Sequence, residues 1–126
     1  MHKHIKEQVY KKNQAPTSLL EKSIMYMLLG ELQEDNPPKA RYYKLPIGKL
    51  RQLFGQDITT QALIEATQGL LLRTFVIEEG KKVMGSSYIS SAMNIPEENM
   101  LEVGVNSMVH PYLLQLRTKY IDALQL

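Results

Sequence analysis

Residues 42–72 read YYKLPIGKLRQLFGQDITTQALIEATQGLLL. The aromatic and aliphatic residues Tyr42–Leu45 predict a short strand, because such side chains suit a pleated, half-buried surface. Pro46 then opens a compact helix over Ile47–Phe54, whose apolar residues recur at helical spacing. Gly55 ends this helix, as glycine commonly does just past a helix C-terminus. The stretch therefore begins as a strand followed by a short helix.

A longer helix follows across a short turn. Thr59 or Thr60 can cap its first turn with a hydroxyl oxygen. Apolar residues then recur every three or four positions from Leu63 to about Leu72. Two helices in tandem across a tight turn are the arrangement by which many DNA-binding domains present a recognition helix.

Another helix is predicted upstream, from about residue 19 to residue 33. Ser18 and Glu21 have the spacing of a capping box, in which each side chain binds the other residue's free backbone amide. Apolar residues recur at helical spacing after it. The segment Glu34–Pro38 contains two consecutive prolines and ends the helix.

The residue pattern switches from helical to alternating downstream. Phe75–Glu78 predicts a strand and Glu79–Lys81 predicts a turn. Over residues 83–95 the odd and even positions separate into two faces, which predicts one long, two-faced strand. Pro96–Asn99 turns the chain, and Leu101–Val105 alternates back as an antiparallel partner. The sequence therefore predicts a long hairpin.

The two ends of the chain differ in character. A final helix is predicted near the C-terminus, with Pro111 in its first turn, where the missing amide hydrogen costs nothing. Its apolar pattern continues to Leu126, which predicts that the helix extends into a longer protein. Residues 1–16 have few apolar positions and predict a mobile basic arm or extended lead-in. The expected organisation is this arm followed by one folded domain over residues 17–126.

Charge is unevenly distributed along the chain. Fifteen basic and 13 acidic residues give a net charge of +2, but residues 1–14 contain four lysines and one glutamate. The remainder has 11 basic and 12 acidic residues and is close to neutral. Because phosphate neutralisation supplies most non-specific DNA affinity, a nearly neutral body predicts weak DNA binding by this domain alone.

The order of the predicted elements is helix, strand, helix, turn, helix and hairpin. This order predicts an α+β fold of the winged-helix class, with the third helix in the recognition position and the hairpin as the wing. Four segments add detail to this prediction, namely Ser18–Glu21 (SLLE), Tyr43–Gly55 (YKLPIGKLRQLFG), Leu70–Thr74 (LLLRT) and Pro111–Tyr120 (PYLLQLRTKY). In this order they resemble the N-terminal winged-helix domain of iteron-type plasmid replication initiators, over roughly residues 17–126.

The resemblance implies a function. Proteins of that family carry two winged-helix domains in tandem, bind repeated origin sequences as monomers, and form dimers that lose initiation activity and often repress their own gene. The first domain is expected to be the main dimerisation module and an auxiliary contact to DNA phosphates. The expected partners are double-stranded origin DNA, a second copy of the chain, and host replication proteins or chaperones. Since this chain stops at Leu126, full initiation by it alone is not expected.

The third helix has few side chains that could read bases in the major groove. It has no lysine or arginine, and Glu65 would repel phosphate, so its polar positions are interpreted as a solvated face. Cations elsewhere could meet phosphates in the usual docking geometry of this fold, although a single surface lysine usually does nothing specific. The candidate phosphate contacts are Lys49, Arg51, Arg73, Lys81 and Lys82.

The predicted long strand offers a second functional surface, because it has four serines, no charge and apolar residues on both faces. Left bare, it would be an aggregation-prone edge, and pairing or packing of two copies about a two-fold axis would cover it. Alternatively, the strand lies inside a three-stranded sheet and its neutral outer face is harmless. The sequence leaves both interpretations open, and the family resemblance favours the dimer. The predicted interface residues are Ser87, Tyr88, Ile89, Ser90, Ser91, Met93 and Val103.

No catalytic, cofactor-binding or metal site is predicted. His2 and His4 offer only two ligands on an end segment, and His110 is interpreted as a helix-start residue because no cysteine or paired carboxylate lies near it in sequence. No glycine-rich phosphate loop or serine elbow occurs. Without cysteines, a signal peptide or a long apolar run, the chain is expected to be a cytoplasmic protein with no membrane association and no enzyme activity.

A second class of function fits the same fold. A winged-helix transcriptional regulator, or a winged helix that binds another protein, would share the architecture without a role in replication, because a fold does not fix a function. The hypotheses differ in how DNA is bound. An initiator domain adds affinity for tandem repeats when it is joined to its second domain, whereas a regulator binds an operator palindrome by itself.

Overall fold

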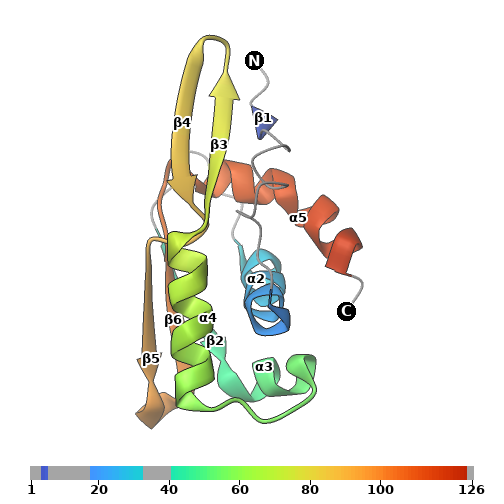
Figure 1. Ribbon diagram of the computed structural model, residues 1–126, viewed down its shortest axis with the longest axis vertical. Coiled ribbons are helices and arrows are strands. Elements are labelled where there is room, and N and C mark those ends of the chain that lie inside the picture. The colour runs from blue at the N-terminus through green and yellow to red at the C-terminus, as the bar shows by residue number, and fades with distance from the viewer. Residues whose placement is uncertain (1–3, 6–17, 33–40, 125–126) are drawn as a thin grey trace.

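The computed structural model describes residues 4–5, 18–32 and 41–124 of the chain. Helices and antiparallel strands are mixed along the sequence (Figure 1). In chain order the elements are β1 (His4–Ile5), α2 (Leu19–Glu31), β2 (Arg41–Pro46), α3 (Ile47–Phe54), α4 (Thr60–Leu72), β3 (Thr74–Glu79), β4 (Lys82–Ser87), β5 (Ser91–Ile95), the 3-10 turn η2 (Pro96–Glu98), β6 (Met100–Val105) and α5 (His110–Leu124).

The helix ends are stabilised by the residues that the sequence predicts. At the start of α2, Ser18 Oγ accepts a hydrogen bond from the Glu21 amide at 3.0 Å, and the Glu21 carboxylate accepts one from the Ser18 amide at 3.4 Å. Thr59 Oγ1 caps α4 by accepting a hydrogen bond from the Ala62 amide at 3.0 Å. Gly55 ends α3 with a left-handed φ of 85°. The predicted capping box is confirmed, and Thr59 is the residue that caps α4.

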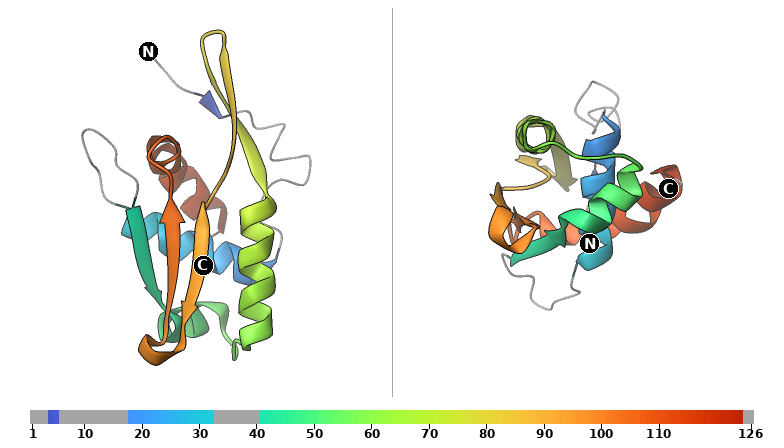
Figure 2. Two further views of the ribbon diagram at one scale, coloured as in Figure 1. Left: turned by 90° about the vertical axis from the view of Figure 1, so that its left-hand side faces the viewer. Right: turned by 90° about the horizontal axis from the view of Figure 1, so that it is seen from below.

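Helix α2 is the centre of the fold. It crosses one face of the sheet formed by β2, β6 and β5 and also packs against α3, α4 and α5 (Figures 1 and 2). In this sheet β6 is the middle strand, and both of its neighbours run antiparallel to it. Burying one large aliphatic side chain contributes about 1.5–3 kcal/mol, so this helix supplies a large part of the core stability. Its fully buried apolar side chains are Ile24, Met25, Leu28 and Leu29.

A second, smaller sheet extends from the end of α4. Strands β3 and β4 form a hairpin that projects beyond the helices (Figure 1). The short strand β1 pairs with β3, with His4 opposite Glu78 and Ile5 opposite Ile77. Two residues of the predicted N-terminal arm therefore form a strand. The rest of that arm lies outside the described residues.

The prediction of one long strand over residues 83–95 is wrong. The chain forms two strands there, because β4 pairs with β3 whereas β5 pairs with β6. Between them, Tyr88 and Ile89 are 0% and 1% exposed, and the Tyr88 ring lies 5.0 Å from the Phe75 ring between centroids. A regular strand sends adjacent side chains to opposite faces, so two consecutive buried side chains interrupt it. The predicted long hairpin is thus two shorter hairpins.

Candidate self-association and nucleic-acid surfaces

Strands β4 and β5 both lie at sheet edges. The strand orders are β1-β3-β4 and β2-β6-β5, so no strand in the described part of the chain pairs with the outer side of either one. The alternative that this segment is interior to a three-stranded sheet is therefore wrong. The β4 edge belongs to the hairpin that projects beyond the helices (Figure 1), whereas α4 runs beside the outer edge of β5 (Figure 2, left), and residues of α4 and β5 line a common pocket. Residues 83–95 carry no charge, and an uncharged edge offers backbone groups to another chain.

The predicted interface residues divide into two groups. Tyr88, Ile89 and Val103 are at most 1% exposed, so they belong to the core of the subunit and have no surface to offer a partner. This part of the prediction placed core residues on the surface, because period-two alternation does not say which residues turn inward. The residues that lie on the edge strands or in the exposed bend beside them are Ser87, Ser90, Ser91 and Met93.

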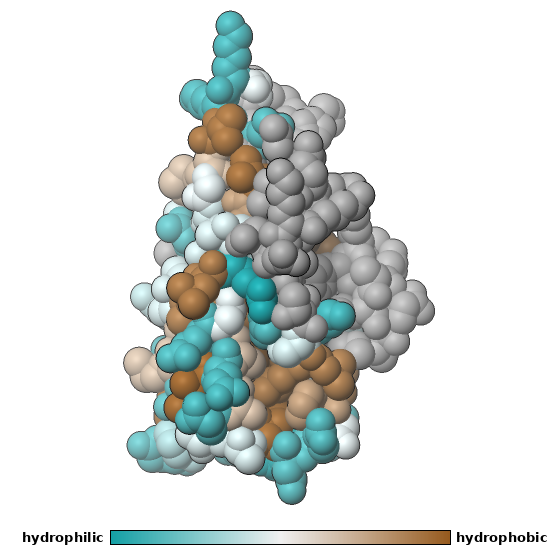
Figure 3. All heavy atoms as spheres, viewed as in Figure 1, coloured by the Kyte–Doolittle hydropathy of each residue, from teal (hydrophilic) through white to brown (hydrophobic). Residues whose placement is uncertain are grey.

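The outer face of the β2-β6-β5 sheet carries apolar surface that the sequence did not single out. Tyr42 on β2 is 71% exposed and Met93 on β5 is 58% exposed. Between them on β6 lie Gly104, opposite Tyr42, and Glu102, opposite Met93. In the part of the chain that Figure 2 (left) shows in colour, no helix covers this face. Val83, near the tip of the hairpin formed by β3 and β4, is 64% exposed. In Figure 3 hydrophobic side chains gather on this hairpin just below its hydrophilic tip.

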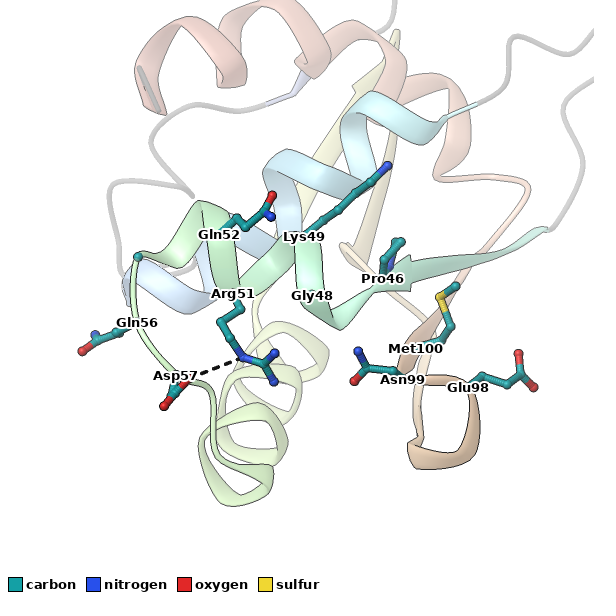
Figure 4. Close-up of a pocket in the computed structure, with 11 residues that line it drawn as sticks. Pro46, Gly48, Lys49, Arg51, Gln52, Gln56, Asp57, Glu98, Asn99 and Met100 are labelled. Carbon is teal, nitrogen blue, oxygen red and sulfur yellow. Dashed lines mark ion pairs between the residues drawn. The ribbon is translucent and has the colours of Figure 1, made fainter.

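Lys49 and Arg51 are exposed on α3 and line a groove between this helix and the turn that joins β5 to β6 (Figure 4). The turn is fixed there because the Ile47 amide donates a hydrogen bond to the Asn99 carbonyl at 3.0 Å. Both side chains are exposed to solvent, and Arg51 also forms an ion pair with Asp57 at 3.6 Å. They remain the predicted phosphate contacts of α3.

Lys81 and Lys82 are exposed at the tip of the β3–β4 hairpin. This tip lies at the opposite end of the molecule from α3 (Figure 1). The structure therefore does not gather the five predicted cations on one surface. It separates the pair on the hairpin from the pair on α3, and it gives Arg73 a different environment.

Arg73 forms an ion pair with Glu21. Its Nε lies 2.5 Å from one carboxylate oxygen of Glu21 and its Nη2 lies 3.1 Å from the other, and the two side chains are 21% and 6% exposed. Burial favours the neutral form of Glu21, but hydrogen bonds from Arg73 and Ser18 outweigh it and hold the pKa of Glu21 below its ordinary value of 4.5. This guanidinium joins the end of α4 to the start of α2, so the structure does not present it to phosphate.

Gly69 makes room for this carboxylate. A Cβ at position 69 would lie 3.0 Å from Glu21 Oε1 and 3.1 Å from its Cδ, and Glu21 is held in place by Arg73. We expect Gly69→Ala to lower the free energy of unfolding by about 1 kcal/mol, although alanine normally stabilises a helix by a similar amount. Gly30→Ala is the matched control, because its new Cβ meets no atom within 4 Å, and it should raise stability by about 0.5 kcal/mol. Urea denaturation compares them, and stabilisation by both changes would contradict this account.

The exposed face of α4 is not built to read DNA. Its Gln61 side chain donates a hydrogen bond to Glu65 at 3.2 Å, and the helix contains no lysine or arginine. Ile64 and Leu72 add apolar surface, with exposed fractions of 40% and 79%. This face has no cation that could bind a phosphate or a guanine. The helix in the recognition position therefore contributes little affinity for DNA.

His110 is the first residue of α5 and is fully buried, which confirms its interpretation as a helix-start residue. Its Nε2 lies 2.8 Å from the Tyr43 hydroxyl oxygen. Among residues 4–5, 18–32 and 41–124, no group of three or more histidines, cysteines or acids could hold a metal ion. Over the same residues no helix has the length and apolar character needed to cross a membrane. His2 lies outside the described residues.

The described elements define a winged-helix domain with two open strand edges. A family model described as "Initiator Replication protein, WH1" matches residues 7–124, and the chain therefore belongs to this family. A similar solved structure is the crystal structure of the MSBI1.176 WH1 domain, a replication protein isolated from a multiple sclerosis patient, with a TM-score of 0.65 and 16% identity over 92% of this chain and 95% of that one. This likeness confirms the predicted winged-helix fold. No curated protein matches the chain.

Family membership confirms the resemblance seen in the sequence and supports a role in replication initiation. The family is one of initiator domains and is not a classical enzyme family. Membership of this family also suggests interaction with DNA.

Proposed function

We propose that this domain pairs with a second copy of itself along β4 and β5 and adds an auxiliary contact to repeated origin DNA. The observation that carries the proposal is that β4 and β5 are both outer strands of their sheets and that residues 83–95, which include all of β5 and all of β4 except Lys82, carry no charge. A two-fold dimer uses the same surface on both copies, as an antiparallel pairing of identical edges requires. Pairing would satisfy the exposed backbone groups and cover apolar surface at Val83 and Met93.

The DNA contact is assigned to α3. Lys49 and Arg51 are exposed there, whereas α4 has no cation and Arg73 is bound to Glu21. Cations that meet phosphates fix the position of a protein on DNA without reading its sequence. The domain would therefore add affinity to origin repeats while another part of a full initiator reads the bases. A regulator that binds a palindrome by itself needs both base-reading side chains and cations on its recognition helix, and α4 has glutamines but no cation.

Met93→Lys tests the pairing. A lysine on each copy of β5 would place like charges on the shared edge, so we expect the dissociation constant of the dimer to rise about tenfold or more. Sedimentation over a range of protein concentrations measures this constant. Met108→Lys is the matched control, because Met108 is 62% exposed in the turn between β6 and α5. A wild-type chain that stays monomeric, or an equal effect of both changes, would contradict the proposed dimer.

A further inference from the structure

We infer that acidic side chains around α3 compete with DNA phosphates for the cations on this helix and on the strand before it, and thereby hold the DNA affinity of this domain low. The inference rests on the proposed function, since it concerns the contact of α3 with DNA. The acids come from two turns. Asp57 belongs to the turn between α3 and α4, and Glu97 and Glu98 belong to η2, in the turn between β5 and β6.

Asp57 occupies the place that a phosphate would take at Arg51. A carboxylate oxygen of Asp57 lies 3.6 Å from Arg51 Nε, and the two side chains are 98% and 45% exposed. In Figure 4 they point toward one another at the edge of the groove. A guanidinium binds carboxylate and phosphate oxygens with the same donor geometry, so a phosphate has to displace Asp57 to reach Arg51. Because the pair is exposed to solvent, displacing Asp57 has only a small free-energy cost.

Glu98 likewise occupies the place that a phosphate would take at Lys44, which lies on β2, the strand before α3. The Lys44 Nζ lies 2.7 Å from a Glu98 carboxylate oxygen, and both side chains are about half exposed. The hydrogen bond from Lys44 to Glu98 and the charge of that carboxylate raise the pKa of Lys44 above its ordinary value, and the charge of Glu102 acts in the same direction. Lys44 therefore stays protonated, with its charge already matched by neighbouring carboxylates.

Glu97 is exposed beside Glu98 in the same turn. Because the Ile47 amide is bonded to the Asn99 carbonyl, this turn is held against the start of α3 and its acids stay near the groove as DNA approaches. A nearly neutral surface releases few counterions from DNA, so its affinity stays low. The charged side chains that line the groove are Lys49, Arg51, Asp57 and Glu98, and Lys44 lies beside it through its pair with Glu98.

Neutralising the acids should strengthen DNA binding. We expect Asp57→Asn and Glu98→Gln each to raise the affinity of the chain for a short duplex of mixed sequence about threefold at low ionic strength, since each removes a groove-lining charge that opposes phosphate. A mixed sequence suffices because phosphate contacts do not depend on the bases. The gain should disappear at high salt, where exposed charges are screened. Fluorescence anisotropy across a salt series measures both effects.

Glu65→Gln is the control for net charge. Glu65 is an exposed acid on α4 that does not line the groove, and its replacement changes the charge of the chain by the same amount. If Glu65→Gln strengthens binding as much as Asp57→Asn does, only the net charge matters and the inference is overturned. It is also overturned if neither acid variant near α3 strengthens binding.

Lys49→Gln separates this inference from the proposed function. It should weaken binding to the same duplex about threefold, because it removes a direct phosphate contact. If Lys49→Gln has no effect, α3 does not meet DNA and the proposed DNA contact fails. If Lys49→Gln weakens binding while the acid variants leave it unchanged, the contact stands and only the competition by carboxylates is refuted.

Discussion

Replacing Tyr88 by alanine is expected to lower the free energy of unfolding by about 4 kcal/mol. Tyr88 is fully buried in the break between β4 and β5, and its ring packs against Phe75 with centroids 5.0 Å apart. Truncation would remove the burial of a large aromatic side chain and leave a cavity that the surrounding strands and helices cannot fill by small movements. The effect should be large because this side chain joins the projecting hairpin to the body of the domain.

Tyr42→Ala is the matched control for Tyr88→Ala. Tyr42 is 71% exposed on the outer face of the β2-β6-β5 sheet, so its truncation should change stability by less than about 0.5 kcal/mol. Urea denaturation, monitored by circular dichroism, compares the two variants at one protein concentration. Similar losses from the two truncations would show that Tyr88 does not have the packing role described here.

Arg73→Ala should lower the free energy of unfolding by about 3 kcal/mol at neutral pH. The variant leaves the Glu21 carboxylate, whose side chain is 6% exposed, without the guanidinium that compensates its charge. Arg51→Ala is the control, because its pair with the exposed Asp57 has a separation of 3.6 Å and should contribute less than about 0.5 kcal/mol. Equal losses in the two variants, measured by urea denaturation, would contradict the structural role of Arg73.

The pH dependence of the Arg73→Ala effect gives a second test. The pKa of Glu21 is lowered in the folded protein, so the stability from its ionised form is present above the ordinary value of 4.5 and is lost as the pH falls through the folded-state pKa. Without Arg73, burial would instead favour the protonated form. The difference between wild type and variant should therefore be largest near neutral pH and shrink in acid. A difference that stays constant into acid would contradict this linkage.

The sequence predicted the helical half of the fold well, because local signals determine it. The bounds of α3 and α4 follow from a proline, a glycine and a threonine cap, each of which acts within one helical turn. The start of α2 follows from the capping box at Ser18 and Glu21 in the same way. The family was also accessible from the sequence, since the four quoted segments keep their order along the chain.

The errors concern features that depend on distant residues. The division of the predicted long strand is caused by burial of Tyr88 and Ile89 together, and period-two alternation cannot indicate such a break. Arg73 looked like a surface cation because its partner, Glu21, lies 52 residues away in the sequence. Tyr42 was missed because the alternation in a short strand does not reveal which face is the core.

The proposed dimer contact and the proposed DNA contact use different parts of this domain. The dimer contact is assigned to the outer strands β4 and β5, and the cations of α3 lie by the turn between β5 and β6 (Figure 4). A paired edge would leave the groove beside α3 open, so a dimer could still touch phosphates weakly. This separation is compatible with the expectation, from the family resemblance, that dimers lose initiation activity and often repress their own gene.

Hydrogen–deuterium exchange of backbone amides tests self-association along β4 and β5 most directly, because it reports on the edge backbone without changing any residue. It should be measured at low and high protein concentration. We predict that amides within residues 82–87 and 91–95 exchange more slowly at the higher concentration, while those of α4 are unchanged. Exchange at both edges that does not depend on concentration, or concentration-dependent protection confined to another surface, would contradict the proposed dimer.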